Sequence, residues 1–202
     1  MPKMEAPTYD RLLDAAQNMI QEIGYNAFSY RHLSDAVGIR TASIHYHFPS
    51  KEDLGEALAK RYRERFNAVL HQIETGSGDA EERIEQYAEQ FLNTLKQGGK
   101  ICLCGMLASD YATLPERVRY QTRMFFAENE EWLARILDEG KKSGAFKFKS
   151  DARDLAITYF STLEGAILDA RMFEDESRMQ RTINCWRNIL LSSGESKQRA
   201  KN

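Results

Sequence analysis

Residues 29–51, SYRHLSDAVGIRTASIHYHFPSK, decide the fold of this chain. Their pattern predicts two short helices joined by a tight turn, followed by the start of a third helix. Gly38 stands at the turn, where glycine is favoured because it adopts backbone conformations that other residues avoid. The stretch is therefore typical of a helix-turn-helix. The positions expected to face a small core are apolar: Leu33, Val37, Ile39 and Ile44.

The second helix of this motif, at about residues 41–48, is expected to expose short hydrogen-bonding and aromatic side chains. Such groups suit contacts with phosphates and base edges in the major groove of DNA. Pro49 stops the helix, and Ser50 is expected to cap the next one together with Asp53. The expected outer surface consists of Thr41, Ser43, His45, Tyr46 and His47.

The run IHYHFPSKEDL, residues 44–54, is more specific than a general helix-turn-helix pattern. It resembles the signature of TetR-family repressors, in which an aromatic pair is followed by the residues that match Phe48, Lys51, Glu52 and Leu54 here. The resemblance covers about the first quarter of the chain. It implies an all-α, nine-helix fold with an N-terminal helix-turn-helix domain and a C-terminal helical bundle. The implied function is a DNA-binding transcriptional repressor.

The resemblance also implies which residues meet double-stranded operator DNA. Tyr46 and His47 match family contacts with phosphates and thymine methyl groups, and Lys51 matches a phosphate contact. His45 stands where tyrosine is commoner, and Arg40 where a small residue is usual. The full expected set is Tyr30, Arg31, Arg40, Thr41, Ser43, His45, Tyr46, His47 and Lys51. A metal site at His45 and His47 is not expected, because side chains two residues apart on a helix diverge by roughly 200°.

Composition bounds the class of protein. The chain has 202 residues, of which 42% are hydrophobic and 29% charged, and only four prolines, so a nearly all-helical globular protein is expected. No run approaches the roughly 18 to 20 apolar residues of a membrane span, and no secretion signal is recognisable. We therefore expect a cytoplasmic protein with no membrane partner. The odd number of cysteines (Cys102, Cys104, Cys185) suits neither a disulfide framework nor a zinc site, and no metal or cofactor is expected.

Charge sets a constraint on DNA binding. The formal net charge is −2, and the first 55 residues are not basic either. Lys3, Arg11, Arg31, Arg40 and Lys51 are outnumbered there by Glu5, Asp10, Asp14, Glu22, Asp35, Glu52 and Asp53. A basic footprint must therefore be local, and we expect modest non-specific affinity with a shallow salt dependence.

Apolar periodicity and capping residues predict nine helices. Their approximate ranges are 9–23, 30–37, 41–48, 51–74, 80–97, 100–111, 115–143, 151–173 and 177–192. The expected N-caps are Thr8, Ser29, Ser50, Asp79 and Ser150. The predicted domains are a DNA-binding domain at 1–50, a linking helix at 51–74, a ligand-binding and dimerisation domain at 75–195 and a disordered tail at 196–202.

Two recognition helices on a palindromic operator require a two-fold homodimer. The last two helices are the expected interface, through Leu163, Ala166, Ala170, Ile183, Trp186 and Leu190. The alternative is that these apolar stripes pack only within one chain. Family members are usually relieved by a small-molecule effector bound in the C-terminal bundle. Candidate effector residues are Phe91, Cys102, Met106, Phe125, Trp132 and Tyr159, with plain core packing as the alternative.

Cys102 has two competing interpretations. The segment CLCGMLASD, residues 102–110, resembles the start of the sixth helix in the NemR-like branch of the family, which senses electrophiles and oxidants through this cysteine. A helix N-terminus and a nearby lysine such as Lys100 lower the pKa of a thiol. The alternative is a small buried hydrophobe, as most free cysteines are.

Two other functional classes compete with a ligand-responsive repressor. A small helical enzyme has little support, because the chain shows no nucleophile elbow, no Gly-rich phosphate loop and no HExxH motif. A helical interaction protein that has lost DNA binding is suggested by the acidic balance of the N-terminal region. Sequence-specific DNA binding distinguishes the repressor from this second alternative.

Overall fold

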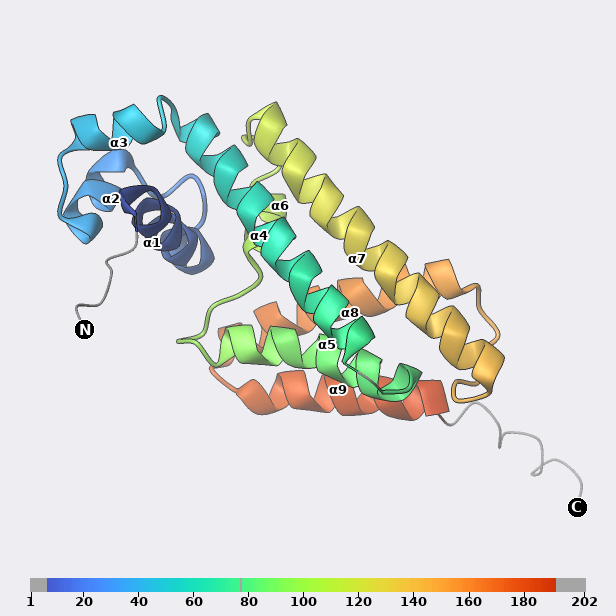
Figure 1. Cartoon of the computed structure of the whole chain (residues 1–202). Helices are drawn as coiled ribbons and strands as arrows, with labels where there is room; N and C mark the ends of the chain where they lie inside the picture. Colours follow the sequence, from blue (N-terminus) through green and yellow to red (C-terminus); the bar gives the residue numbers. More distant parts are fainter. Residues whose placement is uncertain (1–6, 77, 192–202) are drawn as a thin grey trace, which may run out of the picture. The chain divides into compact units, whose positions relative to one another are not determined.

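The computed structural model describes residues 7–76 and 78–191, and their regular structure is entirely helical (Figure 1). The predicted all-α fold is therefore confirmed. In chain order the helices are α1 (Thr8–Ile23), α2 (Tyr30–Val37), α3 (Thr41–His47), α4 (Lys51–Thr75), α5 (Ala80–Leu95), α6 (Leu103–Ser109), α7 (Glu116–Ser143), α8 (Ala152–Met172) and α9 (Glu176–Leu191). The predicted tail at 196–202 lies outside the described residues.

The described residues form two compact units. Unit 1 comprises the described residues of 1–66 and 100–126, and unit 2 those of 67–99 and 127–202. Unit 1 therefore contains the helix-turn-helix together with α6, although α6 lies far along the chain. Helices α4 and α7 each contribute residues to both units.

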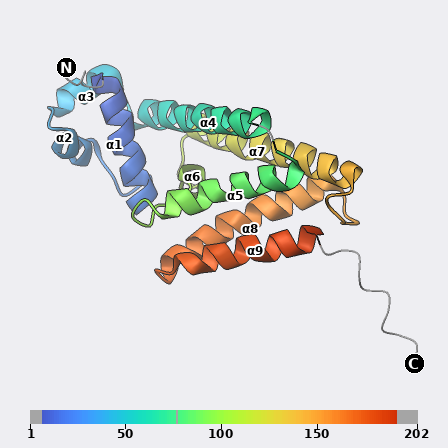
Figure 2. The ribbon, with the colours of Figure 1, turned by 60° about the horizontal axis from the view of Figure 1, so that its bottom comes forward.

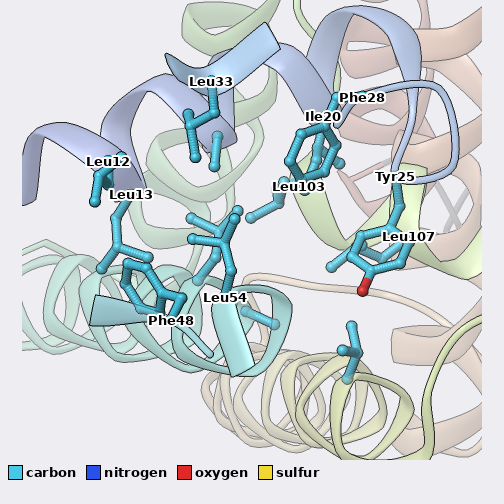
Figure 3. Close-up of a cluster of buried hydrophobic side chains, with 14 of the residues drawn as sticks. Leu12, Leu13, Ile20, Tyr25, Phe28, Leu33, Phe48, Leu54, Leu103 and Leu107 are labelled. Carbon is cyan, nitrogen blue, oxygen red and sulfur yellow. The ribbon is translucent and has the colours of Figure 1, made fainter. Parts of the chain in front are cut away.

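Unit 1 has one apolar core to which α1, α2, α3, α4 and α6 all contribute (Figure 3). The periodic apolar face of α1 packs here, and Leu103 and Leu107 of α6 are completely buried in the same cluster. Tyr25 and Phe28, from the loop between α1 and α2, close one side of it. The contribution of α6 to this core was not predicted from the sequence.

The turn of the helix-turn-helix depends on Gly38, which has φ 74° and ψ 33° in the left-handed region. Its N–H and that of Ile39 both donate to the Ser34 carbonyl, at 2.9 and 3.2 Å, so the left-handed Gly38 ends α2 and satisfies one of its last carbonyls. The Ser34 hydroxyl in turn donates to the Ile39 carbonyl. The predicted role of glycine at this turn is confirmed.

Three of the predicted helix caps are confirmed. In each case the capping side chain accepts a hydrogen bond from a backbone N–H three residues later. At the start of α4 the bonding is reciprocal, because the Asp53 carboxylate also accepts from the Ser50 N–H at 2.9 Å. The pairs are Ser29 with His32, Asp79 with Glu82, and Ser50 with Asp53.

Two predicted caps are wrong by one position. Thr8 is the first residue of α1, and Pro7 precedes it with no side-chain cap. Asp151, not Ser150, caps α8 and accepts from the Arg153 N–H at 2.8 Å. Helix α6 is also shorter than predicted, because Cys102 at its N-cap has extended backbone angles of φ −51° and ψ 128°.

Unit 2 consists of α5, α8 and α9 with the C-terminal parts of α4 and α7. Helices α8 and α9 form a hairpin, and α5 packs against both (Figure 2). Tyr87 of α5 lies at the centre of the unit: its ring stacks on Trp132 with centroids 5.5 Å apart, and its hydroxyl donates to Asn129 at 2.9 Å. Both partners are buried residues of α7. Within the described residues, no helix is both long and apolar enough to cross a lipid bilayer.

We predict that Gly140→Ala destabilises the protein. The Phe146 ring packs directly on the Gly140 backbone, so an added Cβ would overlap two ring carbons and lie 3.0 Å from the Ala80 Cβ. Such overpacking costs about 1–3 kcal/mol, which outweighs the better helix propensity of alanine. Chemical denaturation measures the free energy of unfolding.

The control is the same substitution in a Phe146→Ala background, where the obstructing ring is absent. There Gly140→Ala should be neutral or stabilising relative to Phe146→Ala alone. An equal loss of stability in both backgrounds would contradict the proposed steric origin.

Candidate nucleic-acid interface

Helix α3 presents a polar and aromatic surface to solvent. Tyr46 is the most exposed of the large hydrophobic side chains among the described residues, at 85%. The other predicted contact residues on this helix, Thr41, Ser43 and His45, are also exposed, and His47 is half-buried. The structure therefore brings these five side chains together on one short helix, as the sequence predicted.

The position of α3 is fixed by very few apolar contacts. Ile44 is its only buried residue, and Phe48, immediately after the helix, is 2% exposed. The Phe48 ring packs against Tyr9 of α1 with centroids 4.9 Å apart. These two side chains anchor α3 in the core of unit 1 and leave its opposite face exposed.

Tyr30 holds the C-terminal end of α3. Its hydroxyl lies 2.9 Å from the Phe48 carbonyl and 2.5 Å from the Ser50 carbonyl, so it donates at the junction between α3 and α4. Burial raises the pKa of Tyr30 further above its ordinary value, with Asp53 adding to the effect, so the hydroxyl keeps its proton. Tyr30 was predicted as a groove contact, but its hydroxyl is engaged inside the protein and positions the end of α3.

The two histidines of α3 have different surroundings. The Nδ1 atom of His45 lies 3.1 Å from the Pro49 carbonyl, which fixes the ring when Nδ1 carries the proton. The Nε2 atom is then the one available to an external partner. His47 lies beside two tyrosine rings, with centroids 6.3 Å from Tyr9 and 5.3 Å from Tyr46.

Lys51 has partners inside unit 1. It was predicted to contact phosphate, but its ammonium donates to the Phe28 carbonyl at 2.7 Å. The same group lies over the rings of Tyr25 and Phe28, at 4.7 and 4.4 Å from their centroids. Burial lowers the pKa of Lys51, and the charge of Asp110 partly opposes that shift. Lys51 is thus directed into unit 1, where it stabilises the start of α4.

The basic side chains left on the surface of the helix-turn-helix are few. Arg31 at the start of α2 and Arg40 at the start of α3 are both exposed. Arg11 is not available in the same way, because its guanidinium donates to the Val37 carbonyl at 2.9 Å. The local positive charge next to α3 therefore comes mainly from two arginines, which agrees with the expected modest electrostatic contribution to DNA binding.

The segments at both ends of α6 are bonded to α1 and to the loop that follows α1. Before α6, the buried Gln21 amide donates to the Ile101 carbonyl at 2.8 Å. After α6, the Asp110 carboxylate accepts from the Tyr25 N–H at 3.0 Å. No local pattern predicts these bonds, because they join positions 80 and 85 residues apart.

The start of α4 is also bonded to the start of α7. Arg117 donates to three carboxylates in the first two turns of α4, those of Glu52, Asp53 and Glu56, at 3.2, 2.8 and 2.7 Å. These hydrogen bonds raise the pKa of Arg117 above its ordinary value. Two of the seven acidic residues counted in the N-terminal region, Glu52 and Asp53, are therefore paired within unit 1.

The six candidate effector residues fall in both compact units, three in each. In unit 1, Cys102 is 3% exposed, and Phe125 packs against Tyr62 and Phe66 with centroids 5.5 and 5.2 Å apart. Met106, also in unit 1, is half-buried. In unit 2, Phe91, Trp132 and Tyr159 all pack around the Tyr87 ring.

Cys102 is at the N-cap of α6, and the Tyr62 hydroxyl of α4 lies 3.9 Å from its sulfur. Lys100, which was expected to assist the thiol, instead donates to Asn18 at 2.8 Å. Cys104 is fully buried, whereas Cys185 on α9 is exposed. Tyr62 is the neighbour of Cys102 that sequence reasoning did not find.

The predicted dimer residues require a correction as well. Leu163, Ala166, Ala170, Ile183, Trp186 and Leu190 are all buried within the single chain, at 9% exposure or less. Trp186, for example, packs edge-on against Tyr159 with centroids 5.1 Å apart.

Other apolar side chains of the same helices face outward. These are Ile157, Leu168 and Met172 of α8, Phe173 at its end and Ile189 of α9, with exposures of 40–80%.

We predict that Tyr30→Phe weakens sequence-specific DNA binding although it keeps the ring. The variant loses the hydroxyl that donates to the carbonyls of Phe48 and Ser50, so the end of α3 is held less firmly. The free energy of unfolding should fall by about 1 kcal/mol, the usual contribution of one hydrogen bond. Chemical denaturation and fluorescence anisotropy on a duplex selected by the wild type measure the two effects.

Tyr111→Phe is the matched control, because Tyr111 is 56% exposed and lies after α6 in the same unit. That variant should match the wild type in both measurements. A Tyr30→Phe variant with unchanged affinity would show that the hydroxyl has no positioning role.

Two known families match the chain. Residues 12–58 match the family described as "Bacterial regulatory proteins, tetR family". Residues 80–186 match the family described as "Tetracyclin repressor-like, C-terminal domain". The first match contains the whole of α2 and α3, and the second covers more than half of the chain.

Similar individual proteins are transcriptional regulators. The HTH-type transcriptional repressor NemR of Escherichia coli is 23% identical over 189 residues, which are 92% of this chain and 95% of NemR. A TetR transcriptional regulator from Legionella pneumophila has a solved structure that is 35% identical, covers 93% of this chain and 100% of its own, and has a TM-score of 0.86. A TetR-family regulator from Agrobacterium tumefaciens is 32% identical, with 91% and 97% coverage and a TM-score of 0.88.

Proposed function

We propose, from the premise that this chain belongs to the tetR family of bacterial regulatory proteins, that it represses transcription as a homodimer and releases its operator when an effector binds. Its family and its relatives are DNA-binding transcriptional regulators. The chain is therefore a DNA-binding transcriptional regulator and not an enzyme. It acts in the cytoplasm, where its operator DNA is located. The repressor assignment follows NemR, which is named as a transcriptional repressor.

The exposed surface of α3 is the observation that carries this proposal. Tyr46, His45, Ser43 and Thr41 project from a helix whose opposite side is anchored in the core, so they are free to meet a major groove. Arg31 and Arg40 supply phosphate contacts beside them. Lys51 and the Tyr30 hydroxyl act from inside the unit and hold α3 and α4 in place.

The dimer uses the outward face of α8 and α9. Ile157, Gly165, Leu168 and Met172 follow each other at spacings of three to eight residues and lie on one side of α8, and all four are exposed. An added Cβ at Gly165 meets nothing within 4 Å in the single chain. This exposed stripe with a small residue in the middle suits close packing against the same stripe of a second copy.

We assign residues 1–50 to DNA binding, α4 to the linking role, and the region from residue 75 to ligand binding and dimerisation. The effector is a small molecule, and Cys102 is the candidate for an electrophile-sensitive group. Its contact with the Tyr62 hydroxyl supports this assignment, because modification of the sulfur would disturb a residue of α4 directly. The low exposure of Cys102 requires a small electrophile or a local opening of the structure.

We predict that Tyr46→Ala reduces operator affinity without destabilising the fold. Tyr46 is 85% exposed, so its loss should change the free energy of unfolding by less than about 0.5 kcal/mol. The affinity for the selected duplex should fall about 10- to 100-fold, which corresponds to the loss of specific base or phosphate contacts. Fluorescence anisotropy and chemical denaturation provide the two readouts.

Tyr120→Ala is the control, because Tyr120 on α7 is also exposed and belongs to the same unit. This variant should bind like the wild type. Normal binding by Tyr46→Ala, or equal losses in both variants, would refute α3 as the DNA-contacting helix.

We predict that Leu168→Glu weakens self-association. The charge would be buried in the centre of the proposed interface, where an unpaired carboxylate is strongly disfavoured. Ile23→Glu is a matched control, because Leu168 and Ile23 are both 52% exposed in the single chain. Sedimentation equilibrium should show a dissociation constant at least about tenfold higher for Leu168→Glu. Equal dimerisation of the two variants would place the interface elsewhere.

A further inference from the structure

A groove between α4 and α7 in unit 2 has the features of a ligand site. Asn67 donates to Glu128 at 2.6 Å, and Arg135 donates to Glu74 at 2.6 Å. Both bonds join positions 61 residues apart, so the two helices run parallel here, as the ribbon shows (Figure 1). The groove they enclose has a volume of about 250 Å³, which is enough for a small organic molecule.

The groove is rich in carboxylates. Its lining includes His71 and Glu74 of α4, and Glu128, Glu131, Trp132 and Arg135 of α7. Only one guanidinium faces three carboxylates, and that guanidinium is already paired with Glu74. Glu131 is exposed and forms no hydrogen bond or salt bridge with another described residue. The groove is therefore suited to a cation.

Trp132 provides an independent sign of a missing ligand group. Its side chain is 4% exposed and lines the groove, but its indole N–H has no hydrogen-bond acceptor. The N–H faces the Glu74 carboxylate and, after Arg135, helps to lower the Glu74 pKa, although it does not reach hydrogen-bond geometry. A buried donor without an acceptor is costly, so a ligand oxygen placed beside Glu74 would recover that cost.

We propose that this groove binds a small aliphatic amine that carries a hydroxyl or carbonyl oxygen near its ammonium group. The ammonium pairs with the carboxylates of Glu131 and Glu128, and the oxygen accepts the Trp132 indole N–H. An anion does not suit a groove with three carboxylates. A metal ion does not suit it either, because no three His, Cys, Asp or Glu side chains of the described residues converge to hold one.

Tryptophan fluorescence tests the proposal on the full chain. The chain has two tryptophans, so Trp186→Phe leaves Trp132 as the only indole, and it reports binding in the groove directly. Ethanolamine is the probe, and propylamine is the matched amine that lacks the hydroxyl. Ethanolamine should give a saturable change and bind about three- to tenfold more tightly than propylamine.

Two substitutions test the carboxylate. In the Trp186→Phe background, Glu131→Gln should weaken ethanolamine binding about tenfold, because it removes the free charge of the groove. Glu130→Gln removes a charge at the neighbouring position, which does not line the groove, and should leave binding unchanged. Equal effects of the two substitutions would reduce the binding to general surface charge and overturn the proposal.

A third variant tests the indole. Trp132→Phe keeps an aromatic ring against Tyr87 but removes the N–H, and calorimetry replaces fluorescence as the readout. Circular dichroism confirms that this variant is folded. The preference for ethanolamine over propylamine should disappear in it. A preserved preference, absence of saturation in Trp186→Phe, or equal binding of uncharged ethylene glycol would overturn the proposal.

Discussion

The proposed DNA-contacting surface depends on the anchoring of one short helix. Helix α3 has seven residues, far fewer than the roughly 12 to 15 that an isolated helix needs to be stable in water. Its shape is therefore imposed from outside, by Ile44 and Phe48 in the core and by the Tyr30 hydroxyl at its end. These anchors lie on one side and at one end, so the opposite face of α3 is exposed. Thr41, Ser43 and Tyr46 on that face can therefore suit the DNA that they are proposed to contact, whereas the His45 ring is also held by the Pro49 carbonyl.

The same anchoring explains an unusual distribution of charge. The start of α4 uses Lys51 as an internal bridge to the Phe28 carbonyl and two aromatic rings, so a cation that the motif assigns to phosphate stabilises the fold instead. In compensation, the acidic residues at the start of α4 are paired with Arg117 and present less free negative charge to a nucleic acid. The net charge that the proposed interface presents to DNA therefore depends on which charged side chains are paired within unit 1. It cannot be obtained by counting charged residues along the sequence.

Local sequence patterns predicted the local structure. They could not predict hydrogen bonds and contacts between residues far apart in the chain. The Gly38 turn, the capping pairs and the outward face of α3 follow from spacings of a few residues, so the sequence was sufficient. The direction of the Lys51 side chain depends on Phe28 and Asp110, and the inner or outer position of the α8 stripes depends on α5 and α9. Helix α8 has apolar residues on more than one face, and periodicity alone cannot say which face a neighbouring helix covers. The selected dimer residues were therefore the internal ones.

Helix α6 is distant from α1–α3 in the sequence but is packed against the same core as those helices. It follows α5 by a few residues, yet Leu103 and Leu107 are part of the same core as the helix-turn-helix. Gln21 and Tyr25 bond to the residues that flank α6, and Tyr62 of α4 contacts Cys102 at the N-cap of α6. A change in the position of α6 would therefore have to disturb α1, the α1–α2 loop or α4, all of which support α3. A packed core transmits such a change because it has little free volume in which to absorb it. The segment predicted to belong to ligand sensing is in this way part of the unit that carries α3, the proposed DNA-contacting helix.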